Sequence, residues 1–351
     1  MAKIKLLIVD DSALIRQMLT QIFNECEAIE VVGTAGDPII AREKIKALNP
    51  DVLTLDVEMP RMDGLTFLRN LMRLRPMPVV MISTLTEKGA EVTLEALQLG
   101  AVDFIAKPKI DVSNSLQEYA DEIIAKVKMA AKAKVALLDI NRAAMPQVNS
   151  FVDRVDVKKH FKTTHKIVAL GSSTGGTEAL KNVVKGLPSY APAIVVSQHL
   201  PAAFSVSFAK HVHEATEMTA CIARDGQLIV PGNIYIAPGD RHLLVVRDGA
   251  RYMCRLDDGE PVNHHKPSVE VMFRSVARNV GSNAIGVMLT GMGADGALAM
   301  KEMRDAGAIN IVQDEATSIV WGMPGEAFKQ GAAHYVLPVD KIAAQILALV
   351  D

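Results

Sequence analysis

The chain of 351 residues has few of the features that mark several common classes of protein. Its three cysteines, Cys26, Cys221 and Cys254, are scattered and form no CxxC pair, which argues against a disulfide framework or a cysteine-rich zinc site. No stretch reaches the roughly 18 to 20 apolar residues that span a bilayer. The N-terminal apolar run is too short for a signal peptide and ends in two aspartates. We therefore expect a cytoplasmic protein that is not inserted in a membrane.

An excess of charge of either sign is also lacking. The 38 Lys and Arg residues nearly balance 40 Asp and Glu residues, so the net charge is −2, which argues against nucleic acid as a partner. Hydrophobic residues make up 49% of the chain and charged residues 22%, the profile of ordinary folded protein. The length exceeds that of one typical core, so two domains are expected.

The N-terminal part alternates short apolar runs with helical patterns. Such runs, each followed by a helix, are typical of a parallel sheet covered on both faces, so we predict a five-stranded, doubly wound, flavodoxin-like α/β domain. The expected strands are 5–10, 29–35, 51–56, 78–83 and 102–106, and the expected helices are 12–25, 37–48, 65–74, 87–99 and one from about 115 into the 130s.

The C-terminal part carries a second α/β signal. Residues 129–164 lack sustained periodicity and are predicted to be a linker, which gives domain limits of 1–128 and 165–351. Four short alternating runs within 218–259 predict a β-hairpin region added beside a doubly wound, mainly parallel sheet. The expected buried strands are 166–170, 193–197 and 284–289, and the expected helices are 177–186, 202–213 and 295–306.

Five polar residues follow the strands of the first domain: Asp10, Asp11, Asp56, Ser83 and Lys107. The carboxyl ends of parallel strands meet at one edge of an open sheet, so these side chains are expected to converge. Carboxylates that lie so close together suit Mg²⁺ as a ligand set. An ionised Asp56 beside the metal is then a candidate acceptor of a phosphoryl group, whose oxygens Lys107 and Ser83 would hold. The alternative is that each strand-end acid only caps the next helix.

On these five residues, together with the surrounding LTLDVEMPRMDG and the pair KP at 107–108, the segment from 1 to about 125 resembles a response-regulator receiver domain. The resemblance implies that a partner histidine kinase phosphorylates Asp56. It also implies Mg²⁺ held by Asp10 or Asp11, Asp56 and the backbone carbonyl of Glu58. Phe104 stands at the family's usual switch aromatic, so Ser83, Phe104 and Lys107 would read the added charge. A receiver performs no output chemistry, which must then lie after the linker.

The stretch GSSTGG at 171–176 lies between an expected strand and an expected helix. It fails the phosphate-binding P-loop because Thr177 stands where that motif needs Lys, and it fails the dinucleotide fingerprint because residue 173 is Ser rather than Gly. Gly171, Ser173 and Gly175 do match the G-x-S-x-G nucleophile elbow. That motif is weak alone, and a plain turn or an anion site stays open.

A serine nucleophile needs a base, and the base needs an orienting acid. His199 directly follows the next buried strand, and Asp295 follows a second glycine-rich turn, TGMGADG, after another. Asp295 could instead cap the following helix, and Asp225 and Asp314 are alternatives with poorer placement at strand ends. The order Ser173, His199, Asp295 differs from the Ser, acid, His order of α/β-hydrolases, which argues against that superfamily but not against the chemistry.

The two glycine-rich turns also suggest an oxyanion hole. Backbone N–H groups near Thr174 and Gly175, at a helix N-terminus, would face developing negative charge. A second donor could come from the turn at Met292. Two turns that face one another in this way would line a cleft.

The segments GSSTGGTEAL, QHLP, YIAPGD, PVNHHKPSVEVMF, LTGMGADG and WGMPGEA are similar to the catalytic domain of the chemotaxis protein-glutamate methylesterases, the CheB family. The resemblance maps the family's serine, histidine and aspartate onto Ser173, His199 and Asp295. It implies hydrolysis of glutamyl methyl esters on methyl-accepting chemotaxis receptors with release of methanol, and deamidation of receptor glutamines, without a cofactor in this domain. Ser172 departs from the pattern, because many relatives have Ala there, and it adds a competing hydroxyl.

The paired histidines and the link between the two domains allow two further interpretations. The paired His264 and His265 are not expected to bind one metal ion, because adjacent side chains point apart. A receiver joined by a short linker suggests that the unphosphorylated receiver blocks the Ser173 cleft and that phosphorylation at Asp56 loosens the contact. The competing function is a phosphorylation-dependent regulator whose output domain binds a partner without catalysis.

Overall fold

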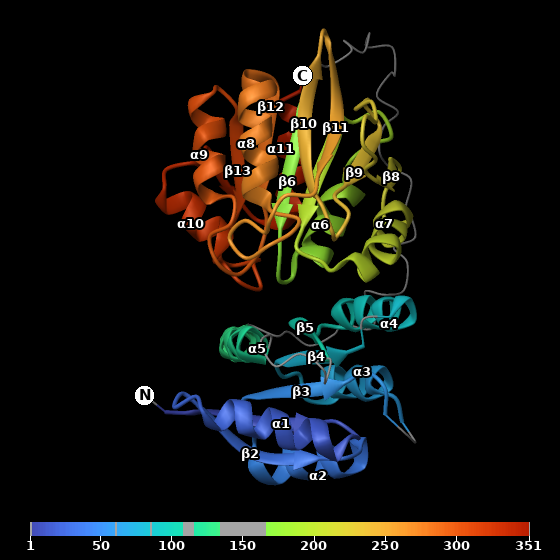
Figure 1. Cartoon of the computed structure of the whole chain (residues 1–351), viewed down its shortest axis with the longest axis vertical. Helices are drawn as coiled ribbons and strands as arrows, with labels where there is room; N and C mark the ends of the chain where they lie inside the picture. Colours follow the sequence, from blue (N-terminus) through green and yellow to red (C-terminus); the bar gives the residue numbers. More distant parts are fainter. Residues whose placement is uncertain (1, 60–61, 85, 108–115, 134–165, 351) are drawn as a thin grey trace, which may run out of the picture.

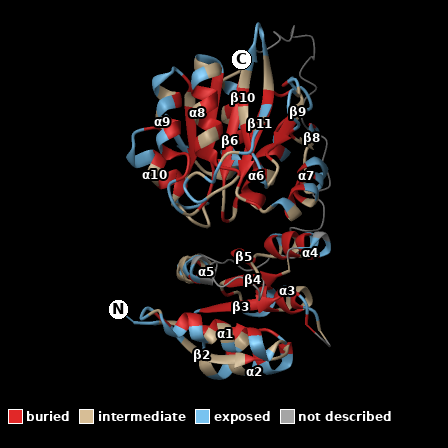
Figure 2. Ribbon diagram, in the orientation of Figure 1, coloured by how far each residue is buried: buried red, intermediate tan, exposed pale blue. Residues whose placement is uncertain are grey.

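The computed structural model describes residues 2–59, 62–84, 86–107, 116–133 and 166–350, which form two α/β units (Figure 1). Buried residues line the interior of both units between sheets and helices (Figure 2). Nearly all of the predicted linker, 129–164, lies outside the described residues, as do Pro108 and Ser115. The limits at 128 and 165 therefore stay predictions.

The N-terminal unit is the predicted five-stranded parallel sheet, in the order β2-β1-β3-β4-β5. Its helices begin where the sequence supplies caps: the Ser12 side chain accepts from the N–H of Ile15, and Asp37 accepts from Ile39 and Ile40. The elements are β1 (Ile4–Val9), α1 (Ala13–Asn24), β2 (Ile29–Ala35), α2 (Pro38–Leu48), β3 (Val52–Asp56), α3 (Gly64–Leu74), β4 (Val79–Ser83), α4 (Glu87–Gln98), β5 (Asp103–Ala106) and α5 (Leu116–Ala130).

The C-terminal unit is built on a seven-stranded parallel sheet, in the order β14-β13-β12-β6-β7-β9-β8. The chain enters at the central strand β6 and leaves it to opposite sides, so the carboxyl end of β6 is the switch point at which open α/β sheets form clefts. The strands of the sheet are β6 (Ile167–Ser172), β7 (Ala193–Gln198), β8 (Thr219–Ile222), β9 (Asn233–Ile236), β12 (Ala284–Met288), β13 (Ile309–Gln313) and β14 (Tyr335–Leu337).

The predicted hairpin region is half right. Only β10 (His242–Asp248) and β11 (Arg251–Asp257) form an antiparallel hairpin. The runs that contain β8 and β9 join the main sheet in parallel, which corrects the prediction for 218–236. An alternating sequence pattern indicates that a strand has one exposed face, but it gives neither the partner strand nor its direction. β8 is an edge strand with no fully buried residue, so its burial does not distinguish an edge of the main sheet from a hairpin.

The helices of this unit follow the predicted ones with two differences. The expected helix at 202–213 divides into a 3₁₀ turn, Ala202–Phe204, and α7 (Ser205–Glu214). The expected helix at 295–306 begins at Ala297, which leaves Asp295 outside it. The helices α8, α10 and α11 were not predicted from the sequence. The helices are α6 (Gly176–Lys185), α7, α8 (Val269–Asn279), α9 (Ala297–Asp305), α10 (Met323–Lys329) and α11 (Val339–Ala348).

The two units contact each other through α4 and β5 of the first unit and the 3₁₀ turn, α6 and α7 of the second (Figure 1). The rings of Phe104 and Phe204 stack with their centroids 4.5 Å apart, and both side chains are buried. Lys210 on α7 lies 3.8 Å from Glu91 on α4. Among the helices that the structure describes, none is both long and apolar enough to cross a membrane.

Candidate active site and phosphoryl-acceptor site

Ser173 is the first residue after β6, at the carboxyl edge of the sheet. Its N–H donates to the carbonyl of Thr290 after β12 at 3.1 Å, and its carbonyl accepts from the N–H of Gly176 at 2.8 Å. Gly175 takes a left-handed φ of 74°, so the turn places its strain on a glycine rather than on Ser173. A Cβ at Gly291 would lie 2.9 Å from the Ser173 Cβ. The two glycine-rich turns of the prediction therefore do meet at this serine.

Gln198, at the end of β7, fixes the backbone around Ser173. Its Oε1 accepts from the Ser172 hydroxyl at 2.6 Å, and its Nε2 donates to the carbonyl of Ser173 at 2.9 Å and to that of His199 at 3.4 Å. Ser172 is fully buried, and its proton is directed at Gln198. Its hydroxyl is thus held in a structural contact rather than beside the cleft as a competing nucleophile.

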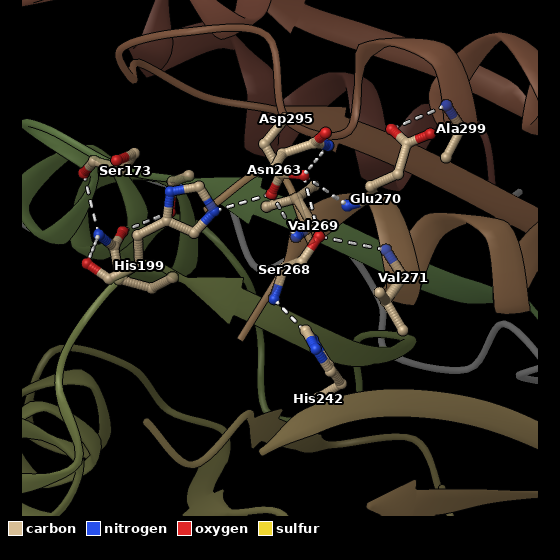
Figure 3. A network of polar contacts seen from close by, with 12 residues as sticks. Ser173, His199, His242, Asn263, Ser268, Val269, Glu270, Val271, Asp295 and Ala299 are labelled. Atoms are coloured by element: carbon tan, nitrogen blue, oxygen red, sulfur yellow. Dashed lines mark hydrogen bonds and ion pairs between the residues drawn. The ribbon is translucent and has the colours of Figure 1, made fainter. Parts of the chain in front are cut away.

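His199 and Asp295 are hydrogen-bonded, with 2.8 Å between the histidine Nε2 and the aspartate Oδ2. The imidazole lies between Ser173 and Asp295, with one nitrogen turned to the carboxylate (Figure 3). The other nitrogen, Nδ1, is buried and has no hydrogen-bond partner within the described ranges, the Ser173 hydroxyl included. The predicted convergence of the three residues is observed, whereas the hydrogen bond from Ser173 to His199 is not formed.

Asp295 accepts hydrogen bonds from several donors besides His199. Besides His199, its oxygens accept from the Asn263 side-chain amide at 2.8 Å, the Ser268 hydroxyl at 2.9 Å and the Val269 N–H at 2.7 Å. Burial opposes ionisation of Asp295, but the hydrogen bond and charge of His199, together with the hydrogen bonds from Asn263 and Val269, lower its pKa to about 2. Asp295 is therefore an anion that can only accept, which requires that His199 Nε2 carries the proton.

The structure does not support the alternatives to Asp295 as the acid that orients His199. Gly296, not Asp295, is the N-cap of α9, so the carboxylate instead faces the N-terminus of α8, where the helix dipole favours an anion. Asp225 accepts from the N–H of Leu256, and Asp314 accepts from Thr317. Neither acid belongs to the His199 pair.

Two residues of the site were not predicted. His265 stacks on His199 with ring centroids 3.7 Å apart and planes 17° apart, and Asn263 donates to Asp295. Burial, and then the neighbouring His199, lower the pKa of His265 to about 4. Both residues lie in the segment PVNHHKPS, so the residues were visible in the sequence, but no spacing rule connects them to His199.

In the first unit, the carboxylates of Asp10, Asp11 and Asp56 each offer an oxygen within 4.8 Å of the others. Lys107 Nζ lies 2.7 Å from Asp56 Oδ2 and 3.6 Å from Asp10 Oδ2. Burial raises the pKa of Asp56 to about 6 and also raises that of Asp10. The predicted convergence of these four residues is observed.

The remaining predicted residues of this unit lie around the cluster. Glu58 donates its N–H to Asp56 Oδ1 at 3.2 Å. The Ser83 hydroxyl accepts from Thr93 at 2.8 Å and so is engaged with α4 rather than with Asp56. Phe104 is buried against Phe204 of the second unit. Of the three residues assigned to the phosphorylation switch, Ser83 therefore contacts α4, Phe104 contacts the domain interface, and Lys107 contacts Asp56.

The interface also reaches the Ser173 turn. The Thr174 hydroxyl donates to Asp103 Oδ2 of β5 across the two units. The side chain of Ile319 lies against Gly175 and also packs on the core of the first unit. A cavity of about 450 Å³ separates α5 from the segment 315–321 beside these contacts. Displacement of the first unit would therefore change the surroundings of the Ser173 turn.

Comparison with known proteins agrees with this two-part organisation. The response regulator receiver domain model matches residues 6–120, and the CheB methylesterase model matches residues 168–346. A protein of Xanthomonas euvesicatoria pv. vesicatoria (strain 85-10), named protein-glutamate methylesterase/protein-glutamine glutaminase 1, is 59% identical over 349 residues, which cover 99% of this chain and 97% of that protein. The chain belongs to the CheB methylesterase family.

Two further relatives support the assignment. A protein-glutamate methylesterase/protein-glutamine glutaminase of Hydrogenovibrio crunogenus is 57% identical, with 100% of both chains covered. The crystal structure of the CheB methylesterase catalytic domain of Thermotoga maritima superposes with a TM-score of 0.52 at 38% identity and covers 53% of this chain and 98% of that one. The predicted fold class, with a receiver before a CheB catalytic domain, and the prediction that the output domain is an enzyme are confirmed.

Proposed function

We propose that this CheB-family chain is a phosphorylation-activated hydrolase of methyl-accepting chemotaxis receptors. It cleaves glutamyl methyl esters, releasing methanol, and deamidates glutamines, with Ser173, His199 and Asp295 as its catalytic residues. The observation that carries the proposal is the 2.8 Å contact between His199 Nε2 and Asp295 Oδ2, with a buried Nδ1 on the other side of the ring that has no hydrogen-bond partner among the residues the structure describes. The names of the relatives support the substrate class.

The proton transfers follow from the tautomer. Since Nε2–H donates to the Asp295 anion, the lone pair of the neutral His199 ring lies on Nδ1, and Nδ1 is the atom that takes the proton of the Ser173 hydroxyl. The Ser173 Oγ attacks the glutamyl carbonyl, and His199 returns the proton to the leaving methanol or ammonia. Water then enters by the same route, and the acyl-enzyme is hydrolysed to the glutamate carboxylate.

The oxyanion of each tetrahedral intermediate needs donors near Ser173. The N–H groups of Ser173 and Gly176 already donate to the carbonyls of Thr290 and Ser173, so we assign this role to Thr174 and Gly175 and, from the facing turn, to Met292. Thr174 is held by its hydroxyl to Asp103 of the receiver. Contact with the receiver thus extends to a proposed oxyanion donor.

The receiver is proposed to accept a phosphoryl group at Asp56 from a histidine kinase. The three clustered carboxylates fit Mg²⁺, because Asp10 Oδ2 is buried without a hydrogen-bond partner in the described residues and a cation would offset the burial of Asp10 and Asp56. Asp10 or Asp11, Asp56 and the carbonyl of Glu58 would hold the ion. When bound, it would neutralise charge on the transferred phosphoryl group.

We further propose that the unphosphorylated receiver restricts access to Ser173. The supporting contacts are the Phe104–Phe204 stack and the hydrogen bond from Thr174 to Asp103, which join the proposed switch residue and its neighbour to the catalytic unit. Charge added at Asp56 would act on Lys107 and Ser83 and so on β5 and α4, which form this interface.

The test is methanol release from methylated receptor membranes by the full chain, with and without a small phosphoryl donor. Ser173→Ala is expected to abolish release under both conditions, and the matched Ser172→Ala is expected to retain it. A phosphoryl donor should accelerate the wild type but not Asp56→Asn. Release by Ser173→Ala at the wild-type rate would overturn the proposal.

A further inference from the structure

The segment 262–265 forms a tight turn that touches both partners of the His199–Asp295 pair. Val262 and His265 exchange both backbone hydrogen bonds, at 3.1 and 3.0 Å. The two residues between them, Asn263 and His264, have φ values of 53° and 66°. Left-handed backbone at two successive residues with side chains is costly, and such strain is concentrated at functional sites.

The strained turn places two side chains on the catalytic pair. Asn263 donates to Asp295 Oδ1 at 2.8 Å, while His199 occupies Oδ2, so the two carboxylate oxygens are fixed by different partners. His265 lies face to face with the His199 ring at 3.7 Å between centroids. Asn263 and His265 therefore restrict the orientation of the carboxylate and of the imidazole from one short segment.

His242 stabilises the two ends of the segment 260–268, which contains the turn. His242 is buried, and its Nδ1 accepts from the N–H of Ser268 at 3.1 Å. The other nitrogen therefore carries the proton and donates to the carbonyl of Glu260 at 3.0 Å. One ring thus ties together the two ends of the segment 260–268 that carries the turn.

The environment of His265 keeps it uncharged. The groups that act on it electrostatically are His199, His264, Asp295 and Lys126 of the receiver's α5. Asp295 favours the charged form, but burial, followed by His199, lowers the pKa of His265 to about 4. A neutral ring can stack on an imidazolium with a favourable electrostatic contact, whereas a charged one would repel it. His265 thus suits a neighbour that becomes positive during the reaction.

We propose that the turn 262–265 is a positioning device for the proposed triad: Asn263 orients the Asp295 carboxylate, and His265 fixes the plane of the His199 ring and stabilises the imidazolium formed when it takes the Ser173 proton. The inference rests on the proposed function, and it adds residues that act through His199 and Asp295 rather than on the substrate. We expect the loss of either side chain to leave the nucleophile and the substrate cleft in place.

The test compares four variants of the full chain, activated with a phosphoryl donor and Mg²⁺: His265→Ala, His265→Phe, Asn263→Gly and His264→Asn. His265→Ala and Asn263→Gly are expected to lower kcat for methanol release about tenfold or more, with KM within about twofold, because the reacting groups lose their orientation. Glycine at 263 keeps the left-handed turn while removing the amide. His265→Phe, which restores a flat ring, should recover most of the lost rate, and His264→Asn, a change to an exposed side chain in the same turn, should be neutral.

A second readout separates positioning from loss of folded protein. The rate at which a fluorophosphonate labels Ser173, normalised to the final amount of label, should fall in His265→Ala and Asn263→Gly while the final amount is unchanged. An unchanged normalised rate and kcat, or a loss in His265→Phe as large as in His265→Ala, would overturn the inference. If Ser173→Ala is also active, the proposed function itself fails; if only the turn variants behave as wild type, this inference alone fails.

Discussion

The Thr174 hydroxyl donates a hydrogen bond to Asp103 and thereby joins the turn after Ser173 to strand β5 of the receiver. Asp103 also lies 3.6 Å from Lys126, which donates to the carbonyl of Phe104 at 2.8 Å and lies over its ring. The residue next to the proposed nucleophile and the proposed switch aromatic therefore share one small network. Substitution of a residue in this network therefore tests the proposed regulation directly.

Asp103→Ala removes the acceptor of that contact. A buried hydrogen bond contributes about 1 kcal/mol, so the unphosphorylated chain is expected to release methanol about fivefold faster, while the phosphorylated chain is little changed. The matched control is Glu30→Gln, an exposed carboxylate on β2 away from the interface. Unchanged basal activity in Asp103→Ala would show that this contact does not restrain the catalytic unit.

The pH dependence of receiver stability follows from Asp56. Burial raises its pKa from about 3.8 to about 6, so the folded state binds this proton more tightly than the unfolded chain. Its contribution to stability is present in full below pH 3.8 and is lost as the pH rises through about 6. Asp56→Asn removes the titration, and its stability gain over the wild type should be about 2 kcal/mol larger at pH 8 than at pH 4.5.

The difference in the free energy of unfolding between Asp56→Asn and the wild type is measured by following the unfolding of the receiver in denaturant, without divalent cations. Addition of Mg²⁺ at pH 8 is expected to narrow it, since a cation among the three carboxylates stabilises the ionised wild type and has less to bind in the variant. A stability gain of equal size at both pH values would contradict the assignment of a buried carboxylate with a raised pKa to Asp56.

Substitution of Ser172 tests whether its hydroxyl has a structural role while that of Ser173 is the nucleophile. Ser172→Ala leaves Gln198 Oε1 without its donor in a buried site, so we expect a loss of about 1 kcal/mol in the free energy of unfolding. Because Gln198 Nε2 still holds the carbonyl of Ser173, kcat should stay within about threefold of the wild type. Thermal unfolding and methanol release on the same samples check both statements, and a loss of activity as complete as that of Ser173→Ala would contradict them.

Asp295→Asn tests the tautomer of His199. The amide can present a donor to Nε2 and so favours the proton on Nδ1, where it blocks uptake of the Ser173 proton. We expect kcat to fall by about 10⁴, the size of effect that a wrong tautomer has in serine proteases. Asp305→Asn, an exposed acid on α9, is the matched control, and a decrease of less than tenfold at position 295 would argue against the mechanism.

The features that depend on strand ends could be predicted from the sequence. The clustering of Asp10, Asp56 and Lys107 and that of Ser173, His199 and Asp295 were predicted correctly, because parallel strands bring their carboxyl ends to one edge of the sheet whatever the loops do. The direction of β8 and β9 was missed, since alternation does not encode the partner strand. Asn263 and His265 were missed because a turn of left-handed residues reaches the site from outside the sheet.

The most direct test of the account is the identity of the residue that forms the covalent intermediate. The full chain, activated with a phosphoryl donor, is treated with a fluorophosphonate, digested and mapped by mass spectrometry. We predict a single adduct on Ser173, absent in Ser173→Ala, retained in Ser172→Ala and formed far more slowly in His199→Ala. An adduct on Ser172, or labelling at Ser173 at the same rate without His199, would contradict a serine activated by His199 and Asp295.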